Sequence, residues 1–492
     1  MGGRPARPVR PAPVGDDRAP GRAHSQQVGV RDGHQPQAAL PTPGPHLAPR
    51  LPAHLPGRAR RLNVGHQPAG SRSSVVVVGS GFGGLAVTKG LRRLAVDVVA
   101  VDRNNFHTFQ PLLYQVATAG LDAENVAASV RGIFADQARF DFRCAEVSAV
   151  DLDRRCVMAG KVRIPYDRLV LAAGATSSDY GVPGVGEHAF FLKTLAEAVR
   201  LRNHVLRQFE DAAADPSLVD QGALTVVVVG GGATGVELSG ALVELFGHVL
   251  AKDFRRLDIS AAKVVLLEAT DHLLGAFSPP SRALALRTLT HRGVDVRFGA
   301  AVTRVEPGAV HLADGSAIST RTVAWVAGVR PVPLAERLGL PTDRSGRLAV
   351  EPDMHVPGHP EVFAIGDLAG GWPQLAPVAI QQGRHVARQI ARALEGRETR
   401  PFRYRDKGTM ATIGRNAAVA ELPLGVHLGG FVAWVMWLVL HLVTLVGFRN
   451  RASVLLNWAW NYLTYDRGAR LILQETSPLE GTSPLEEPSP PR

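Results

Sequence analysis

The sequence SVVVVGSGFGGL, from Ser74 to Leu85, carries the strongest structural signal in the chain. Four consecutive valines predict a short strand that is buried on both faces of a parallel sheet. Three glycines follow with the spacing G-x-G-x-x-G, typical of a tight turn that leads into a helix and binds a pyrophosphate at the helix N-terminus. These are Gly79, Gly81 and Gly84. An acid about 20 residues further on is expected to bind a ribose hydroxyl, and Asp102 stands at that place.

A second copy of this pattern lies between Leu224 and Leu242, which reads LTVVVVGGGATGVELSGAL. Its glycines are Gly230, Gly232 and Gly235, and the next apolar run, KVVLLEA, carries Glu268 at the position of the acid. No arginine follows Glu268 closely enough to pair with a 2′-phosphate, so this acid favours NADH over NADPH. Two dinucleotide sites in one chain indicate a bound flavin and a nicotinamide cofactor.

Length, charge and cysteine content exclude several classes of protein. The chain has 492 residues, enough for about two to four domains with a sizeable core. The formal net charge is +11, but residues 1–72 hold 11 Arg against three Asp, or +8. The remainder therefore gives no reason to expect nucleic acid as a partner. The two cysteines, Cys144 and Cys156, are twelve residues apart, which argues against a metal site and against a C-x-x-C redox pair.

Shifts in composition divide the chain into six segments. Residues 1–72 are rich in Pro, Gly, Ala and Arg without apolar periodicity, so we expect a disordered extension or upstream sequence read from a start codon placed too early. The other segments are expected to be the first part of an FAD-binding domain (74–190), an NADH-binding domain (191–320), the second part of the FAD-binding domain (321–395), a C-terminal membrane-anchoring region (396–473) and a flexible tail (474–492).

The C-terminal region differs in character from the rest. Phe431 to Phe448 is an apolar run of eighteen residues in which His441 and Thr444 are the polar members, and a membrane span needs about 20. Val454 to Leu473 alternates apolar with polar residues and is rich in Trp, Tyr and Arg, as membrane-surface segments are. We expect both segments to lie on a membrane rather than to cross it. A buried core helix and a dimer interface are the alternatives.

Several motifs together closely resemble those of the type II NADH dehydrogenases, single-subunit NADH:quinone oxidoreductases, over about residues 74–472. The motifs are GSGFGGL, FQPLLYQVATAGL, GGGATGVE, VFAIGDLA, AIQQG and KGTMATIGR, in the order of that family. The resemblance implies an α/β fold with two Rossmann-like dinucleotide-binding domains, for FAD and NADH, and a C-terminal membrane-associated helical region. It also implies non-covalent FAD, NADH as substrate, a membrane quinone as acceptor without proton pumping, a homodimer, and a peripheral position on the cytoplasmic face of the cell membrane.

The resemblance also assigns roles to individual residues. FAD is expected to contact Gly79, Gly81, Gly84, Asp102, Ala173, Gly174, Gly366 and Asp367, and NADH is expected to contact Gly230, Gly232, Gly235 and Glu268. Gln381 and Gln382 are expected to line the quinone site. Glu237 and Lys407 are expected to pair near the nicotinamide, although a structural salt bridge is an equally good interpretation of that pair. Where many members of the family have Ala-Gln, this chain has Ala376-Pro377, which leaves the quinone's identity open.

Three other functions stay open from the sequence. A soluble flavin reductase that serves ferredoxin or rubredoxin would share both nucleotide sites but would not need the apolar C-terminus. A sulfide:quinone oxidoreductase would need cysteines beside the flavin, whereas Cys144 and Cys156 stand outside the glycine motifs. A membrane-bound redox sensor would bind NADH and a partner protein without turnover.

Overall fold

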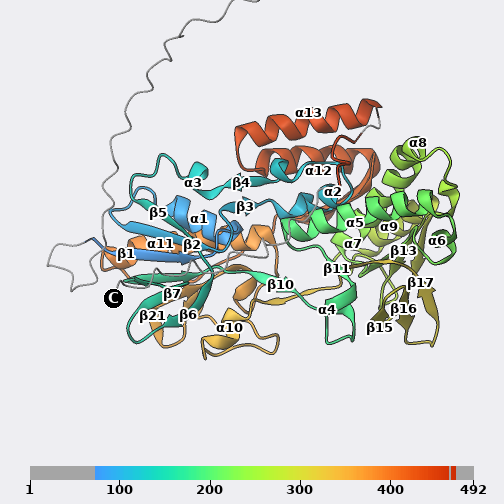
Figure 1. The fold of residues 1–492 in the computed structure, drawn as a ribbon. Coiled ribbons are helices and arrows are strands. Elements are labelled where there is room, and N and C mark those ends of the chain that lie inside the picture. The colour runs from blue at the N-terminus through green and yellow to red at the C-terminus, as the bar shows by residue number, and fades with distance from the viewer. Residues whose placement is uncertain (1–71, 465–466, 473–492) are drawn as a thin grey trace, which may run out of the picture. The chain divides into compact units, whose positions relative to one another are not determined.

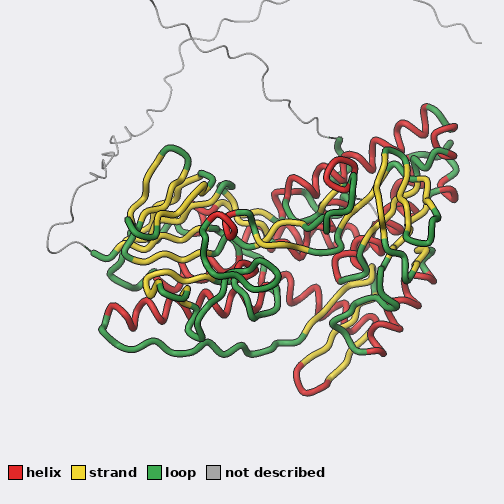
Figure 2. The backbone as a smooth tube through the Cα atoms, turned by 90° about the horizontal axis from the view of Figure 1, so that it is seen from below, coloured by secondary structure: helices red, strands yellow, loops and turns green. Residues whose placement is uncertain are grey.

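The computed structural model describes residues 72–464 and 467–472. The extension predicted over 1–72, apart from Arg72, and the tail predicted over 474–492 lie outside these residues. Two sheets of mainly parallel strands dominate the described chain. Figure 1 labels β1, β2 and β5 of the first sheet and β11 and β13 of the second, and Figure 2 shows the strands as two groups bordered by helices.

The first sheet has six strands, with the predicted valine strand in its interior. In spatial order they are β20 (His355–Val356), β21 (His359–Ala364), β9 (Arg168–Leu171), β1 (Ser74–Val78), β2 (Asp97–Asp102) and β5 (Phe140–Cys144). β1 runs parallel to both β2 and β9. Val75, Val76 and Val77 are completely buried, because an interior strand covered on both faces has no side left for solvent. The strand prediction is confirmed.

The second sheet has five strands, all parallel to their neighbours. In spatial order they are β11 (Phe190–Phe191), β18 (Thr322–Trp325), β12 (Thr225–Val229), β13 (Lys263–Leu267) and β14 (Val294–Arg297). The second valine run forms β12 in the middle. The two predicted Rossmann-like units are therefore present as two separate sheets.

The two sheets repeat one winding pattern. In each, a valine strand leads through a glycine turn into a helix, α1 (Phe82–Leu91) or α7 (Ala233–Glu244), and then into the neighbouring strand. A three-stranded antiparallel sheet follows the outer strand, and the chain then returns beside the valine strand. These small sheets are β6 (Val147–Asp151), β7 (Cys156–Ala159) and β8 (Val162–Pro165) in the first unit, and β15 (Val302–Glu306), β16 (Ala309–Leu312) and β17 (Ala317–Ser319) in the second.

The chain crosses between the units through a two-stranded ribbon. β10 (Ala175–Ser177) leaves the first unit and pairs antiparallel with β19 (Val329–Pro331), which returns to it. We assigned Thr322 to Pro331 to the returning FAD-binding segment, which is wrong for its first half, because β18 pairs with β12 in the second sheet. The run TVAWVAG reads equally well as a strand of either sheet, so the sequence alone did not locate the crossing.

Long helices complete the nucleotide units. α5 (Leu195–Ala214) begins with a capping box in which Thr194 and Glu197 satisfy each other's backbone amides. α11 (Ala376–Leu394) packs so closely on α1 that an added Cβ on Gly90 would lie 2.5 Å from the Cβ of Ala387. α9 (Pro279–His291) packs beside α7 and β14. The close α1–α11 contact places the turn after β21 beside the first glycine turn.

The C-terminal region contains a sheet as well as the predicted helices. β22 (Thr409–Gly414), β23 (Ala417–Leu422) and β24 (Val426–Gly429) form an antiparallel sheet on which α7 and α12 (Gly430–Thr444) pack. The sequence predicts a helical region here, because a run as short as KGTMATIGR gives too weak a periodicity to predict a strand. α13 (Phe448–Thr464) runs beside α12 at the upper edge of Figure 1. Within the described residues, no helix combines the length and apolar character needed to cross a membrane.

Short elements make up the rest of the described chain. They are β3 (Phe106–Thr108), η1 (Gln110–Leu112), α2 (Leu113–Ala117), η2 (Ala123–Asn125), β4 (Ala127–Ser129), α3 (Val130–Ile133), α4 (Val185–His188), α6 (Ser217–Asp220), η3 (Leu245–Leu250), α8 (Ala251–Asp253), η4 (Ile259–Ala261), α10 (Leu334–Arg337), η5 (Gly366–Leu368) and η6 (Pro423–Gly425).

Candidate active site

The first glycine turn leaves room for a ligand at one glycine and none at the other two. Gly79 has φ +101°, and a Cβ there would collide with the backbone of Ala172. A Cβ on Gly84 would collide with the carbonyl oxygen of Gly79. At Gly81, by contrast, no atom lies within 4 Å of an added Cβ. Two glycines are thus required for packing, and the third opens a space into which a phosphate group fits.

The second glycine turn repeats this division of roles. Gly230 has φ +113°, and a Cβ there would lie 2.6 Å from the Cα of Ala327. A Cβ on Gly235 would collide with the carbonyl oxygen of Gly230, whereas nothing lies within 4 Å of one on Gly232. Since the same glycine of each turn faces open space, both turns are shaped for the same kind of ligand.

Both helices that follow these turns begin without a side-chain cap. The N-cap residues are Gly81 for α1 and Gly232 for α7, and neither first turn holds an acidic residue. The first amides of a helix need acceptors, and they favour negative charge. A dinucleotide pyrophosphate supplies both, so each of the two turns is suited to a dinucleotide.

The two predicted acids hold equivalent positions. Asp102 accepts a hydrogen bond from the amide of Ser80 at 2.6 Å, and Glu268 accepts one from the amide of Gly231 at 2.7 Å. Each acid therefore fixes the residue after the first glycine of its own turn. Burial raises the pKa of Asp102, and the backbone amides of Asn104 and Ser80 oppose the rise. A carboxylate at this place can still accept a hydrogen bond from a ribose hydroxyl through its other lone pairs.

A cavity of about 680 Å³ lies at the first turn, within the size range of cofactor sites. Seven of the eight residues predicted to contact FAD line it, namely Gly79, Gly81, Asp102, Ala173, Gly174, Gly366 and Asp367. Gly84 does not line it, since its role is to let the helix approach the turn. Lys193 also lines the cavity, and its Nζ lies 3.1 Å from Oδ2 of Asp367. We did not single out Lys193, because it belongs to no sequence motif that we recognised.

Gln382 lies buried beside this cavity with one half of its amide unsatisfied. Its Oε1 accepts a hydrogen bond from the amide of Gly366 at 2.7 Å. Its Nε2 has no hydrogen-bond partner among the described residues, although the side chain is fully buried. Protein atoms alone bury Nε2, and Gln382 does not line the cavity. Gln382 thus holds the Gly366 turn from behind the cavity wall.

Gln381 and Lys407 lie together, away from Gln382. The amide of Gln381 is occupied by the backbone of Arg405, donating to its carbonyl at 2.9 Å and accepting from its N–H at 3.1 Å. Lys407 is exposed and lines the same surface hollow as Gln381. Among the described residues, no ion pair joins Lys407 to Glu237. The predicted roles of Gln381 and Lys407 stay predictions, and this arrangement supports Gln381 mainly as a clamp on the chain near Arg405.

Glu237 lies on α7, one turn beyond Gly232, in an apolar environment. Burial raises its pKa to about 8, opposed weakly by the amide of Thr412, 3.4 Å from Oε1, and by the indole of Trp437. Tyr114 lies nearby. Burial raises the pKa of Tyr114 well above its usual value, and the Glu237 carboxylate raises it further when it is ionised. At neutral pH, Glu237 therefore carries a proton that it can donate. The sequence assigned neither Tyr114 nor Trp437 a role beside Glu237, and Trp437, in the segment expected to lie on a membrane, is buried.

Pro377, where the chain departs from the family pattern, occupies the first turn of α11. Proline is favourable there, because that backbone amide has no partner within the helix. Pro377 therefore leaves the helix intact while removing an amide side chain beside Ala376 and Ala379, which line the flavin-sized cavity. Pro377 itself does not line the cavity.

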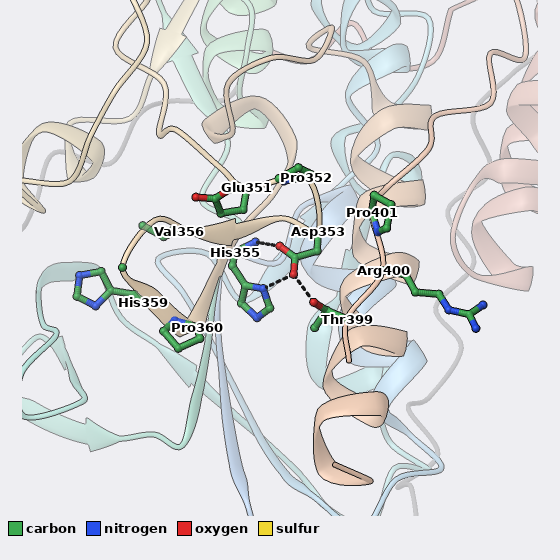
Figure 3. A pocket seen from close by; sticks show the side chains of 11 residues that line it. Glu351, Pro352, Asp353, His355, Val356, His359, Pro360, Thr399, Arg400 and Pro401 are labelled. Carbon is green, nitrogen blue, oxygen red and sulfur yellow. Dashed lines mark hydrogen bonds and ion pairs between the residues drawn. The ribbon is translucent and has the colours of Figure 1, made fainter. Parts of the chain in front are cut away.

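A separate hollow of about 480 Å³ lies between β20 and residues 399–401, far along the chain from the glycine turns (Figure 3). Asp353 lies at its centre, with Nδ1 of His355 at 2.8 Å and the Thr399 hydroxyl donating at 2.5 Å. Burial raises the pKa of Asp353, but the hydrogen bonds from Thr399 and His355 outweigh it and leave the pKa lowered. The hydroxyl donates to the carboxylate and not to the imidazole, so this is no nucleophile–base pair. The cluster ties the segment after α11 to β20.

Residues 73–383 match the family described as pyridine nucleotide-disulphide oxidoreductase, and residues 407–465 match the family described as NDH2 C-terminal domain. Two proteins of Mycobacterium tuberculosis, named type II NADH:quinone oxidoreductase Ndh and NdhA, are each 38% identical to this chain. Each alignment covers 82% of this chain, with 91% of Ndh and 90% of NdhA.

Two solved structures share the fold at low identity. NDH2 from Plasmodium falciparum, solved in complex with NADH, has a TM-score of 0.76 at 18% identity and covers 82% of this chain and 100% of its own. The sulfide:quinone oxidoreductase of Aquifex aeolicus has a TM-score of 0.62 at 18% identity, covering 77% of this chain and 92% of its own. The fold is therefore common to both chemistries and does not by itself choose between them.

Proposed function

This chain belongs to the type II NADH:quinone oxidoreductases of the pyridine nucleotide-disulphide oxidoreductase family, and from this membership we propose how its residues perform that reaction. The enzyme oxidises NADH and reduces a quinone by way of FAD, without pumping protons. The flavin ring, when bound, accepts a hydride and returns two electrons to the quinone. The observation that carries the proposal is the pair of equivalent glycine turns, each with open space at its middle glycine and an uncapped helix behind it.

The residues around the cavity of about 680 Å³ would hold FAD without a covalent bond. The free amides at the start of α1 would bind its pyrophosphate, and Asp102 would accept from a ribose hydroxyl. Gly366 and Asp367, held by Gln382 and Lys193, would also contact it, and Ala173 and Gly174 would let the backbone approach it. Ala376 and Ala379, at the start of α11, line the same cavity.

The second turn holds NADH. Gly232 and the first amides of α7 receive its pyrophosphate, and Glu268 accepts from the adenosine ribose. Gly230 and Gly235 keep the turn tight enough for this contact. Because an acid at the ribose repels a 2′-phosphate, the site selects NADH over NADPH.

Glu237 is the proposed proton donor for quinone reduction. A carboxyl group with a pKa of about 8 holds its proton at neutral pH and can release it to a neighbouring base or oxygen. Quinone reduction consumes two protons for its two electrons, so a buried proton donor on α7 is useful.

The substitution Glu237→Gln keeps the shape of the side chain and removes its acidic proton. We expect it to lower the rate of quinone reduction with soluble quinone at least tenfold. Unchanged quinone reduction together with unchanged NADH binding would exclude this role.

The outer faces of α12 and α13 meet the membrane. Phe448, Leu456 and Leu463 of α13 are 86%, 70% and 79% exposed. Polar side chains in its second half point inward instead, where Asn457 donates to Asn125 at 3.1 Å and Trp458 donates to Gln115 at 2.8 Å. Water-soluble helices show the opposite arrangement. Apolar side chains outward and amides inward suit a helix that lies on lipid with its other face docked on protein.

The acceptor pool, the side of the membrane and the oligomeric state rest on separate arguments. The acceptor is a quinone dissolved in the same membrane. The enzyme is peripheral on the cytoplasmic face, since NADH is a cytoplasmic reductant. A homodimer is proposed from the family resemblance, and light scattering of the detergent-solubilised protein tests it.

A spectroscopic titration of the purified protein tests the whole assignment. NADH is expected to bleach the flavin absorbance at once, and a soluble quinone analogue is expected to restore it. A redox sensor would bleach but would not turn over with quinone. A ferredoxin or rubredoxin reductase would pass electrons to those proteins in preference to quinone. Protein that folds without flavin and takes none up would contradict the proposal.

A further inference from the structure

The exposed face of α11 carries an unusual concentration of positive charge. Arg384 and Arg388 stand one turn apart on the side of the helix that faces solvent. Like charges at this spacing repel and weaken a helix. An anion bound between the two charges would relieve this repulsion.

The segment after α11 adds three more cations to the same place. Phe402 is buried and Tyr404 is half-buried, while Arg403, Arg405 and Lys407 point outward between and after them. The amide of Gln381 holds this segment against α11 through the backbone of Arg405. We call the resulting depression the basic hollow, which has a volume of about 450 Å³. Its five cations are Arg384, Arg388, Arg403, Arg405 and Lys407.

The described residues do not neutralise the basic hollow. None of its five cations forms an ion pair with a carboxylate in the part of the chain that the structure describes. Asp406, the acid within this segment, uses its carboxylate to accept from the amide of Gly408 at 2.9 Å. Buried at the base of the hollow, His385 is kept neutral, because burial and the neighbouring Arg388 both lower its pKa. The surface therefore holds five cations beside the single carboxylate of Asp406, and it keeps a net positive charge.

The positive charge continues from the hollow to the apolar face. Val446, between α12 and α13, packs against the cluster that contains Leu85 of α1. α1 in turn packs on α11, so it lies between α11 and the start of α13. Arg451 stands three residues after Phe448, which is almost fully exposed. Exposed apolar residues and a basic surface therefore adjoin each other at this end of α13.

From this arrangement we propose that the basic hollow binds the headgroups of anionic membrane lipids while the outer faces of α12 and α13 enter the acyl region. The inference rests on the membrane docking proposed above and adds a lipid preference and an orientation to it. Phosphate groups of lipids carry the charge that the hollow lacks, and their depth in the bilayer matches cations placed beside an apolar face. Contact at two adjoining surfaces also fixes which side of the molecule faces the lipid.

Binding of the full-length FAD-loaded enzyme to vesicles tests this proposal. The variant carries Arg384→Gln, Arg388→Gln and Arg403→Gln, none of which touches the nucleotide turns. The matched control carries Arg163→Gln, Arg287→Gln and Arg344→Gln, three exposed arginines elsewhere on the described surface. Vesicles of phosphatidylcholine alone and of phosphatidylcholine with phosphatidylglycerol are compared by flotation at low salt. Flavin content and NADH oxidation with a soluble quinone show that each variant is folded.

The expected result is a loss confined to the first variant and to anionic vesicles. Each cation removed lowers partitioning onto an anionic surface about fivefold, so the triple variant should bind about 100-fold more weakly. The control variant should change only through its general charge, by much less, and binding to neutral vesicles should be the same for all three proteins. High salt should remove the difference between wild type and variant.

Three outcomes would overturn the proposal or its premise. Equal binding of wild type to neutral and anionic vesicles would reject the lipid preference but leave the docking intact. Failure of wild type to bind either kind of vesicle would reject the docking itself. A rise in the melting temperature of wild type but not of the variant with inorganic phosphate alone, combined with equal vesicle binding, would assign the hollow to a free anion instead.

Discussion

Glu237 is held in a state far from that of a carboxyl group in water. Its neighbours on α7 are apolar, and the amide of Thr412 is its best partner. The sequence motif GGGATGVE predicted an acid near the nicotinamide, but the motif could not show whether that acid is charged. Burial, which decides the charge, depends on β22 and α12, which come from a distant part of the chain.

The pKa of Glu237 makes the stability of the enzyme depend on pH. The pKa rises from 4.5 to about 8 on folding, so the protonated group contributes stability that is complete below the unfolded pKa and is lost as the pH rises through 8. Between about pH 6 and pH 8 the loss is roughly 2 kcal/mol. Glu237→Gln should remove this slope. Urea unfolding of both proteins at the two pH values measures it, and parallel pH dependence would contradict the assignment.

The two glycine turns allow ligand contact and packing to be separated by substitution. Alanine at Gly81 or Gly232 meets open space in the protein, so the fold should tolerate it. Gly81→Ala is expected to weaken FAD binding at least tenfold, and Gly232→Ala is expected to raise the KM for NADH while the protein stays yellow. Gly84→Ala is the matched control, because it collides with the Gly79 backbone and should destabilise the protein itself by about 1–3 kcal/mol. Equal effects of Gly81→Ala and Gly84→Ala on stability would contradict this division.

At the scale of the element, the strands and helices with regular apolar periodicity were predictable from the sequence. The face of α13 that contacts protein was not. The valine strands and the helices after the glycine turns are where the sequence placed them. α13 was predicted as an amphipathic segment from Val454, yet it begins at Phe448, and its polar side chains contact protein. A helical wheel shows two faces but does not tell which of them is inside. That choice is made by Asn125 and Gln115, more than 300 residues earlier.

Substitutions on the two faces of α13 should have opposite effects. Asn457→Ala removes the hydrogen bond to Asn125 and should lower the free energy of unfolding by about 1 kcal/mol, with membrane binding unchanged. Leu456→Ser, on the adjacent outward position, should leave stability unchanged and weaken vesicle binding several-fold. Thermal unfolding and vesicle flotation of each variant distinguish the two effects. Weaker vesicle binding in Asn457→Ala alone would reverse the assignment of the faces.

The whole molecule contains two copies of one winding pattern, which the β10–β19 ribbon joins. Both units and the existence of a return to the first were predictable, because each valine run carries its own turn and acid. The point where the chain crosses between the units was not predictable. β18 and β19 follow each other closely in the sequence and differ only in the strands with which they pair. The antiparallel sheet β22–β24 was missed, because short alternating strands give weak signals.

Removal of FAD should weaken the molecule as a whole. The cavity that fits FAD is lined by both parts of the first unit, from Gly79 to Ala379, so the bound cofactor connects them. A ligand at 100 times its Kd stabilises a protein by about 2.7 kcal/mol. Deflavinated protein should melt at a lower temperature, and added FAD should restore the original value. Calorimetry measures both, and NADH alone should not replace FAD in this experiment.

The inward amides and outward leucines of α13 have a practical consequence for anyone who purifies the enzyme. In buffer without detergent those leucines have no lipid to contact, so the molecules will aggregate through them. The yield will therefore depend on the detergent that is present during lysis. Replacing them with charged residues would prevent this aggregation. It would also keep the enzyme in aqueous solution, away from the quinone in the membrane.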